Sequence, residues 1–186
     1  MKSICVFCGS SMGVRPEYEW ATHKMGKSLV ERHLRLVYGG GRVGLMGKLA
    51  DVVLEAGGKV VGVIPRFLHD KEIAHQELTQ LYIVDSMHER KFRMAELSDA
   101  FIALPGGYGT LEEVCEIITW AQLGLHHKPI GILNVANYYN PLLDFFNQAV
   151  AEGFIVPAAL RHLVLDSESP EILLDLLEEY VPGSLL

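Results

Sequence analysis

The chain has 186 residues, of which 49% are hydrophobic and 21% are charged, a balance typical of a globular domain with one buried core. Its formal net charge of -7 argues against general nucleic-acid binding, because that affinity comes mainly from clustered Lys and Arg. No apolar run approaches the roughly 20 residues that span a bilayer, and the first residues lack the apolar core of a signal peptide. We therefore expect a cytoplasmic protein with no membrane or nucleic-acid partner.

A short apolar run, a glycine cluster and a helical pattern recur along the chain. In chain order, we predict strands at residues 4–7, 34–38, 59–64, 81–84, 100–104, 130–133 and 163–165. We predict a helix that begins near Pro16 and further helices at residues 45–56, 88–97, 110–123, 139–152 and 170–180. Strands that alternate with helices lie parallel and are joined by right-handed crossovers. The sequence therefore predicts an α/β fold: one domain with a doubly wound, mostly parallel sheet and helices on both faces.

The three cysteines are expected to be free thiols, since an odd number in a chain without an export signal fits a reducing compartment. Cys5 and Cys8 have the spacing of redox and metal motifs, but residues three apart on a strand point to opposite faces. Buried small hydrophobic residues are the better explanation. We find neither a histidine spacing typical of metal sites nor a G-x-S-x-G elbow, so we expect no metal and no serine nucleophile.

The strongest functional signal follows the predicted 100–104 strand. It is a glycine-rich run made of Pro105, Gly106, Gly107, Tyr108, Gly109, Thr110, Leu111, Glu112 and Glu113. Glycines at a strand end let the backbone approach a ligand closely, and a helix start offers unpaired N–H groups that suit phosphate. Thr110 fits both an N-cap residue and a hydroxyl donor. A purely structural turn fits the same pattern, because one glycine-rich loop alone is weak evidence.

Glu113 is the candidate catalytic carboxylate in this run. Helical spacing predicts an apolar face made of Leu111, Val114, Cys115 and Ile118. We therefore expect Glu113 on the opposite face, clear of the core and just beyond the phosphate loop. Acidic residues in a first helical turn also complement the helix dipole, so catalysis and helix stabilisation both remain open.

Two further glycine clusters follow predicted strands. Gly9 and Ser10 come after the 4–7 strand. Gly40 and Gly41 belong to a glycine-rich run after the 34–38 strand that contains a G-x-x-G-x-x-G spacing. Parallel strands share one carboxyl edge, where ligands of such sheets bind. The spacing is not the dinucleotide fingerprint G-x-G-x-x-G, and the following strand does not end in the acidic residue that binds a ribose. The clusters favour a mononucleotide ligand.

A charged run at the start of the predicted 88–97 helix supplies cations near the same edge. The planar guanidinium of Arg90 can bind a phosphate or sugar hydroxyls, and Lys91 adds positive charge. A solvated helix face is the commoner explanation of a charge run. Its position beside the glycine loops favours a role in binding.

Two of these motifs together resemble the signature pair of the LOG ("Lonely guy") family. They are Gly106-Gly107-Tyr108-Gly109-Thr110-x-x-Glu113 and Met87-His88-Glu89-Arg90-Lys91. The resemblance extends from Cys5 to about Val156. Members of this family are cytokinin riboside 5′-monophosphate phosphoribohydrolases, long mislabelled as lysine decarboxylases.

The resemblance implies a Rossmann-like homodimer, without a cofactor, that hydrolyses an N6-substituted adenosine 5′-monophosphate or AMP to free base and ribose 5-phosphate. The partner is then a small nucleoside 5′-monophosphate. It implies that Arg90 and Glu113 are the catalytic pair and that residues 107–110 hold the phosphate. It also implies substrate contacts from Glu72, Lys91, Glu112 and Thr119.

Two other functions remain open. A nucleotide or cofactor carrier could use the same fold and glycine loops without turnover. A lysine decarboxylase would consume lysine with pyridoxal phosphate, for which we find no supporting motif. Trp120 lies off the predicted apolar face and fits either a subunit interface or a second packing contact.

Overall fold

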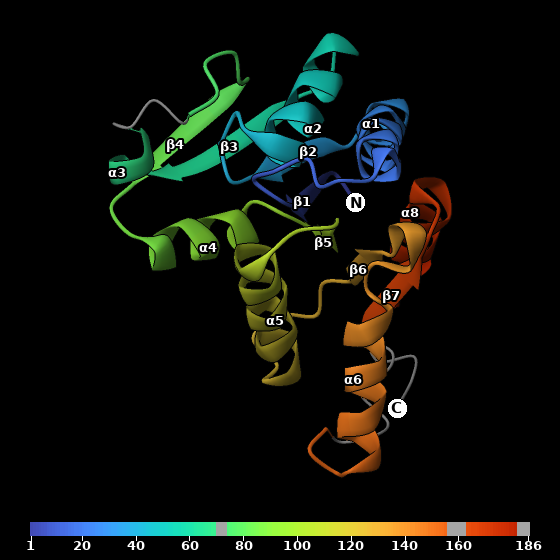
Figure 1. Cartoon of the computed structure of the whole chain (residues 1–186). Coiled ribbons are helices and arrows are strands. Elements are labelled where there is room, and N and C mark those ends of the chain that lie inside the picture. The colour runs from blue at the N-terminus through green and yellow to red at the C-terminus, as the bar shows by residue number, and fades with distance from the viewer. Residues whose placement is uncertain (70–73, 156–162, 182–186) are drawn as a thin grey trace.

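The structure, a computed structural model, describes residues 1–69, 74–155 and 163–181. Its centre is a seven-stranded sheet in which each neighbouring strand pair is parallel (Figure 1). The strands are β1 (Ser3–Phe7), β2 (Arg35–Tyr38), β3 (Val60–Pro65), β4 (Gln80–Val84), β5 (Ala100–Ala103), β6 (Ile130–Leu133) and β7 (Val164–Ser167). The predicted doubly wound α/β fold is confirmed.

Helices connect the strands and cover both faces of the sheet (Figure 1). They are α1 (Pro16–Glu31), α2 (Gly44–Glu55), α3 (Arg66–His69), α4 (Met87–Glu96), α5 (Tyr108–Gln122), the 3-10 turn η1 (Val135–Asn137), α6 (Asn140–Ala151) and α8 (Pro170–Glu179). The sequence did not predict α3 and η1, which are too short to show a helical period. Among the described residues, no helix has both the length and the apolar composition that crossing a membrane requires.

The strand order β4-β3-β2-β1-β5-β6-β7 reverses direction at β1. The chain first builds outward from β1 through β2 and β3 to β4, and then returns to place β5 on the other side of β1. The loops after β1 and β5 therefore leave the sheet side by side at its carboxyl edge. Doubly wound sheets bind their ligands at such a switch point.

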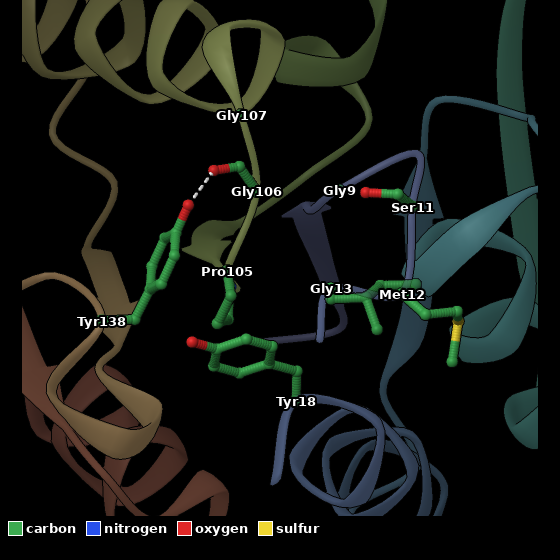
Figure 2. Close-up of a pocket in the computed structure, with 10 residues that line it drawn as sticks. Gly9, Ser11, Met12, Gly13, Tyr18, Pro105, Gly106, Gly107 and Tyr138 are labelled. Atoms are coloured by element: carbon green, nitrogen blue, oxygen red, sulfur yellow. Dashed lines mark hydrogen bonds between the residues drawn. The ribbon is translucent and has the colours of Figure 1, made fainter. Parts of the chain in front are cut away.

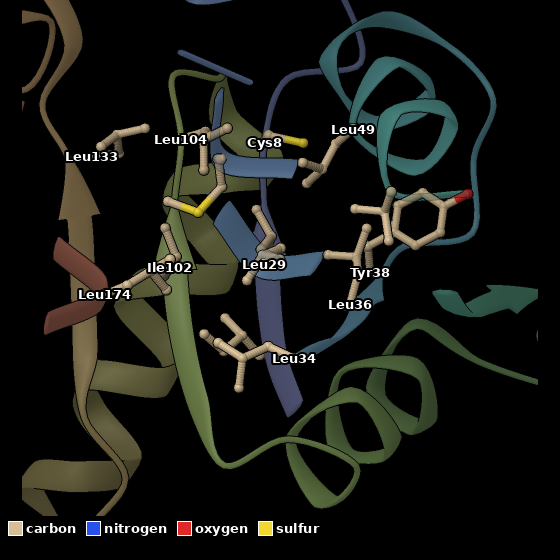
Figure 3. Packing of buried hydrophobic residues seen from close by; sticks show 14 of the residues in the cluster. Cys8, Leu29, Leu34, Leu36, Tyr38, Leu49, Ile102, Leu104, Leu133 and Leu174 are labelled. Atoms are coloured by element: carbon tan, nitrogen blue, oxygen red, sulfur yellow. The ribbon is translucent and has the colours of Figure 1, made fainter. Parts of the chain in front are cut away.

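Successive residues along each strand point to opposite faces of the sheet, so the core has two layers. One contains Ile4, Val6 and Leu36 and packs under α1, α2 and α8, as Figure 3 shows around Leu29, Leu49 and Leu174. The other contains Cys5, Phe7 and Val37 and packs under α4, α5 and α6. Cys5 and Cys8 thus lie on opposite faces, as predicted, and all three cysteines are free thiols.

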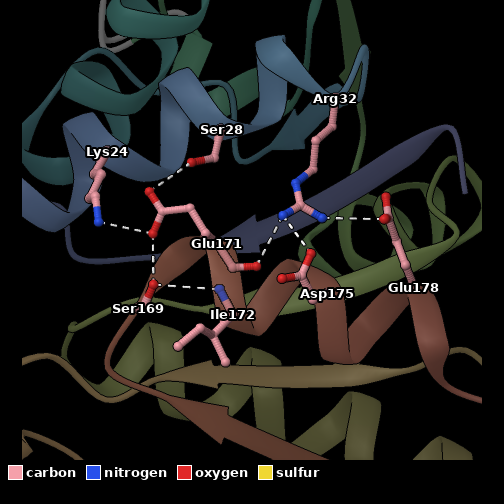
Figure 4. Close-up of polar contacts among 8 residues, drawn as sticks. All are labelled: Lys24, Ser28, Arg32, Ser169, Glu171, Ile172, Asp175 and Glu178. Atoms are coloured by element: carbon pink, nitrogen blue, oxygen red, sulfur yellow. Dashed lines mark hydrogen bonds and ion pairs between the residues drawn. The ribbon is translucent and has the colours of Figure 1, made fainter.

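Ion pairs join α1 to α8 across the outside of the first layer (Figure 4). Arg32 pairs with Asp175 at 2.7 Å and with Glu178 at 3.2 Å, while Lys24 lies 2.9 Å from Glu171. Lys24 and the three carboxylates are exposed and Arg32 is partly exposed, and ion pairs in such positions contribute little each. The buried apolar contacts beneath them carry most of the packing energy.

Sequence and structure differ mainly at element ends. The strand expected to stop before Pro65 includes this residue, which pairs with Val84 on β4. A proline is compatible with the last position of a strand because little of the hydrogen-bond ladder follows it. Other boundaries shift by one or two residues, which is the usual fraying of element ends.

Candidate functional site

The loops after β1 and β5 touch directly at the carboxyl edge of the sheet. The amide of Gly9 donates to the carbonyl of Pro105 at 3.0 Å. A side chain at Gly106 would overlap the side chain of Thr110 and approach the Gly9 nitrogen. Glycine is therefore required at Gly106, because two loops and a helix start converge there.

Helix α5 begins two residues earlier than the sequence suggested. Gly107 is its N-cap and makes no side-chain cap bond, whereas Thr110 was expected to cap the helix. The Thr110 side chain is instead buried against Gly106, so the N-cap prediction was wrong. The first amides of α5 therefore lack a side-chain cap, and amides at a helix start are suited to bind an anion.

Helix α4 directs Arg90 across the sheet edge. The Ser86 hydroxyl caps this helix by accepting from the amide of Glu89 at 3.1 Å. One turn in, Arg90 Nε donates to the carbonyl of Val63 at 3.1 Å, and Nη1 donates to Glu113 Oε1 at 2.6 Å. Arg90 and Glu113 are only 7% and 8% exposed. The structure thus joins the two residues that the family resemblance implies to be a catalytic pair.

Glu113 lies on the inner face of α5, not on the outer face that helical spacing predicted. The buried apolar residues of α5 are Val114, Ile117 and Ala121, while Cys115 is exposed. A carboxylate can take a core position here because the Arg90 guanidinium is buried beside it. Burial raises the pKa of Glu113, and the positive charge of Arg90 opposes this rise.

Gly39 belongs to this site, although only Gly40 and Gly41 of its glycine run were predicted to contact the ligand. A side chain at Gly39 would overlap the guanidinium of Arg90. The missing Cβ therefore provides the space in which Arg90 crosses from α4 to Glu113. The only signal in the sequence was a glycine directly after an apolar strand, which does not reveal the distant residue that fills the space.

Lys91 has two carboxylate partners on α5. It forms a hydrogen-bonded ion pair with Glu112 and lies 3.0 Å from Glu116. Burial alone would lower the pKa of Lys91, but the hydrogen bonds to Glu112 and Glu116 raise it overall. With 7% of its surface exposed, Lys91 is buried like Arg90, so a solvated helix face does not describe these residues.

The second glycine loop is tied to the segment that follows residues 70–73. The Gly40 carbonyl accepts from the amide of His75 at 2.9 Å, and Gly41 forms an antiparallel bridge to Ala74. Gly40 has φ of 75°, a conformation that favours glycine. Glu72, a predicted substrate contact, lies outside the described residues.

The other predicted contacts are spread along the loops and α5. Tyr108 and Gly109 are exposed at the helix start, Leu111 is half-buried, and Ser10 is exposed on the first loop. Thr119 donates to the carbonyl of Cys115 at 2.7 Å, two turns further along the helix than Glu112. Thr119 therefore shares a helix face with Glu112 but lies about 10 Å along the axis from it.

A pocket of about 200 Å³ opens between the loop after β1 and the loop after β5, on the side of α1 (Figure 2). Its walls include Tyr18 from α1 and Tyr138 from the turn after β6. The Tyr138 hydroxyl donates to the carbonyl of Gly106 at 2.6 Å. No sequence motif pointed to either tyrosine, because they meet the loop only through the fold.

Residues 46–177 match the model of the family described as "Possible lysine decarboxylase". Among curated proteins, the chain is 54% identical over 181 residues to the probable cytokinin riboside 5′-monophosphate phosphoribohydrolase LOGL2 of Oryza sativa subsp. japonica. That match covers 97% of this chain and 74% of the relative. The Arabidopsis thaliana phosphoribohydrolase LOG1 is also 54% identical, over 97% of this chain and 84% of its own length. The chain belongs to the LOG family.

The LOG-family fold also resembles a solved structure with another role. The molybdenum cofactor carrier protein of Chlamydomonas reinhardtii superposes with a TM-score of 0.72 at 19% identity, over 96% of this chain and 99% of the carrier. At that identity the likeness concerns the fold alone. Function has to be argued from the residues of the site.

Proposed function

We propose that this chain hydrolyses the N-glycosidic bond of N6-substituted adenosine 5′-monophosphates, or of AMP itself, and releases the free base and ribose 5-phosphate. The observation that carries the proposal is the buried 2.6 Å contact between Arg90 and Glu113 beside the uncapped start of α5. The activity named for its LOG-family relatives supports the same reaction.

We assign the phosphate to backbone amides because of the charges around the site. Arg90 and Lys91 face three carboxylates, those of Glu112, Glu113 and Glu116. These five side chains do not provide a net positive charge for a phosphate dianion. The amides at the start of α5 offer unpaired N–H donors and the partial positive charge of the helix dipole, which suit such an anion. Residues 107–110 therefore hold the phosphate in our proposal.

Glu113 is the residue that acts on the anomeric carbon. Cleavage of a glycosidic bond passes through an oxocarbenium-like state, which a nearby carboxylate stabilises. The bond to Arg90 engages Oε1, so Oε2 is the oxygen that orients the attacking water as a general base. Arg90 holds this carboxylate and binds the ribose hydroxyls, which fixes the distance to the reacting carbon.

The remaining predicted contacts complete the proposed substrate site. Gly9, Ser10, Gly40 and Gly41 form loops at the same edge of the sheet, beside Gly106 and Gly107. Lys91 and Glu112 line the α4–α5 side, with Leu111 next to Glu112 and Thr119 two turns further along α5. We assign Glu72 a substrate contact on the family resemblance alone.

We also propose that the protein is a cytoplasmic homodimer. The three free cysteines favour a reducing compartment. Large apolar side chains are exposed near the end of α5 and on α6, among them Leu123, Leu125 and Phe145. Such surface is often covered by a second subunit. Analytical ultracentrifugation at micromolar concentration tests the dimer, and a monomer at all concentrations would contradict it.

The decisive experiment compares the wild type with Glu113→Gln in the presence of AMP or isopentenyladenosine monophosphate. We expect wild-type release of free base and a loss of at least about 100-fold in the variant, because a general base is removed. Nucleotide binding should persist, since amides hold the phosphate. Glu96→Gln is the matched control, because it removes an exposed carboxylate from the far end of α4. Near-normal turnover by Glu113→Gln would exclude this residue from the mechanism.

The same assay separates the two rival functions. A cofactor or nucleotide carrier would bind the nucleotide and release no base. A lysine decarboxylase would consume lysine when supplied with pyridoxal phosphate and leave AMP intact. Either result would overturn the proposal.

A further inference from the structure

Tyr138 contacts the phosphate loop from a distant part of the chain. It follows β6, yet its hydroxyl donates to the carbonyl of Gly106, 32 residues earlier, at 2.6 Å (Figure 2). The Gly106 carbonyl and the Gly107 amide belong to one planar trans peptide unit, so they point in opposite directions. Holding the carbonyl on the Tyr138 side therefore fixes the direction of the Gly107 N–H at the start of α5.

The Tyr138 ring is held by two aromatic neighbours. It stands edge-on to Tyr18 on α1, with ring centroids 5.6 Å apart, and edge-on to Tyr139 at 5.0 Å. Both arrangements are favourable for aromatic pairs. The hydroxyl is thus presented from a fixed ring and not from a freely rotating side chain.

The turn before Tyr138 has an unusual backbone that the surrounding bonds stabilise. Ala136 and Asn137 both adopt positive φ, at 51° and 61°, which costs roughly 1 kcal/mol or more for a residue with a Cβ. The Asn134 side chain accepts from the amide of Tyr139 at 2.8 Å and donates to Asn140 at 2.7 Å. Strain that is retained in this way commonly marks a functional constraint.

A packing role alone does not explain the Tyr138 hydroxyl. The neighbouring Tyr139 already anchors the end of β5, since its hydroxyl donates to the Leu104 carbonyl at 2.7 Å from a buried position. Tyr138, by contrast, is 40% exposed and reaches the glycine loop itself. Its bond engages the peptide between Gly106 and Gly107, at the start of α5.

We propose that Tyr138 is a positioning residue whose hydroxyl, through the Gly106 carbonyl, sets the Gly107 amide to bind the 5′-phosphate. This role rests on the proposed function. Tyr138 itself need not touch the reacting atoms. Its effect is confined to the phosphate end of the substrate, so it should be absent from ligands that lack the phosphate.

Tyr138→Phe tests this role because it removes only the hydroxyl and keeps the ring contacts. Calorimetry would measure the dissociation constants of ribose 5-phosphate and of adenine, neither of which has a glycosidic bond to break. We expect the constant for ribose 5-phosphate to rise about threefold to tenfold, the equivalent of one hydrogen bond, while that for adenine stays at the wild-type value. The kcat/KM for AMP should fall by at least the same factor.

Tyr139→Phe serves as the structural control. It removes a comparable hydroxyl hydrogen bond from the adjacent residue. It should lower the melting temperature more than Tyr138→Phe does, and it should not change the dissociation constant of ribose 5-phosphate relative to that of adenine. Unchanged binding of ribose 5-phosphate to Tyr138→Phe, or equal weakening of both ligands, would overturn the positioning role. If the wild type released no base, the proposed function would fail, yet the ribose 5-phosphate comparison would still test Tyr138.

Discussion

The two faces of the sheet use ion pairs in different ways. On the α1 and α8 face, the partly exposed Arg32 pairs with exposed carboxylates, outside an apolar layer. On the α4 and α5 face, Arg90 and Glu113 form a pair that is about nine-tenths buried, within the core side of α5. The first face would keep its packing without its charges. The second face has the charged Arg90 and Glu113 in positions that two apolar side chains could fill.

The difference follows from the free energy of desolvation. An exposed ion pair loses little hydration and gains little attraction, so it contributes at most about 1 kcal/mol to the free energy of unfolding. A buried pair gives up hydration that its mutual attraction only partly returns, so two apolar residues are often as stable. A buried pair at the ligand edge of a sheet is therefore better explained by chemistry than by stability.

The largest expected effect comes from breaking the buried pair. Arg90→Met leaves the Glu113 carboxylate buried without its partner, which should lower the free energy of unfolding by about 3–5 kcal/mol. Urea unfolding at pH 7 measures this change. Arg32→Met is the matched control on the other face and should cost about 1 kcal/mol or less.

A double variant sharpens the same comparison. Arg90→Met with Glu113→Leu removes both charges, and we expect it to regain most of the lost stability while remaining inactive. Equal losses for Arg90→Met and Arg32→Met would contradict the distinction between the two faces.

Gly39→Ala should have the next largest effect. The new Cβ would overlap the Arg90 guanidinium, so we expect a loss of about 1–3 kcal/mol in unfolding free energy together with reduced kcat. Gly26→Ala places a methyl group against Val52 between α1 and α2, on the opposite face. It should lower stability and leave kcat unchanged. A Gly39→Ala enzyme with wild-type kcat would show that Arg90 tolerates displacement.

The pH dependence of the reaction should report the burial of Glu113. Burial raises the pKa of this carboxyl above its usual value of 4.5. As the pH falls, Glu113 is therefore protonated, and lost as a base, at a higher pH than an ordinary glutamate. We expect the acid limb of kcat/KM for AMP to lie above pH 4.5. Glu112→Gln removes a neighbouring negative charge that raises the pKa of Glu113, and should shift this limb to lower pH.

The smallest effect is expected at Glu171, on the exposed face. Partial burial would raise its pKa, but hydrogen bonds from Ser169 and Lys24 outweigh this and lower the pKa to about 2. A folded pKa below the unfolded value stabilises the protein above about pH 4.5, and this stability is lost as the pH falls towards 2. The contribution of this exposed group should be under about 1 kcal/mol.

Unfolding of the wild type and Glu171→Gln at pH 6 and pH 3 measures that contribution. The variant should be less stable at pH 6, and the two proteins should become more alike at pH 3. A constant difference between them at both pH values would exclude titration of Glu171 as the cause.

The sequence predicted the parts of the fold that depend on local order. Apolar runs separated by glycine clusters were sufficient to place the seven strands and the main helices, because strands buried on both faces and helix starts have local signatures. The Arg90 and Glu113 motifs were also visible as family signatures. Their mutual contact was not visible, since it joins two helices through a gap left by Gly39.

Local order thus determined the doubly wound sheet, its glycine loops and the residue types gathered at its carboxyl edge. Tertiary structure decided on which side of α5 Glu113 lies and which tyrosine reaches Gly106. Helical periodicity assigns a carboxylate to the solvent side by default. Only a buried partner from another element can reverse that preference, and its identity depends on contacts between residues far apart in the chain.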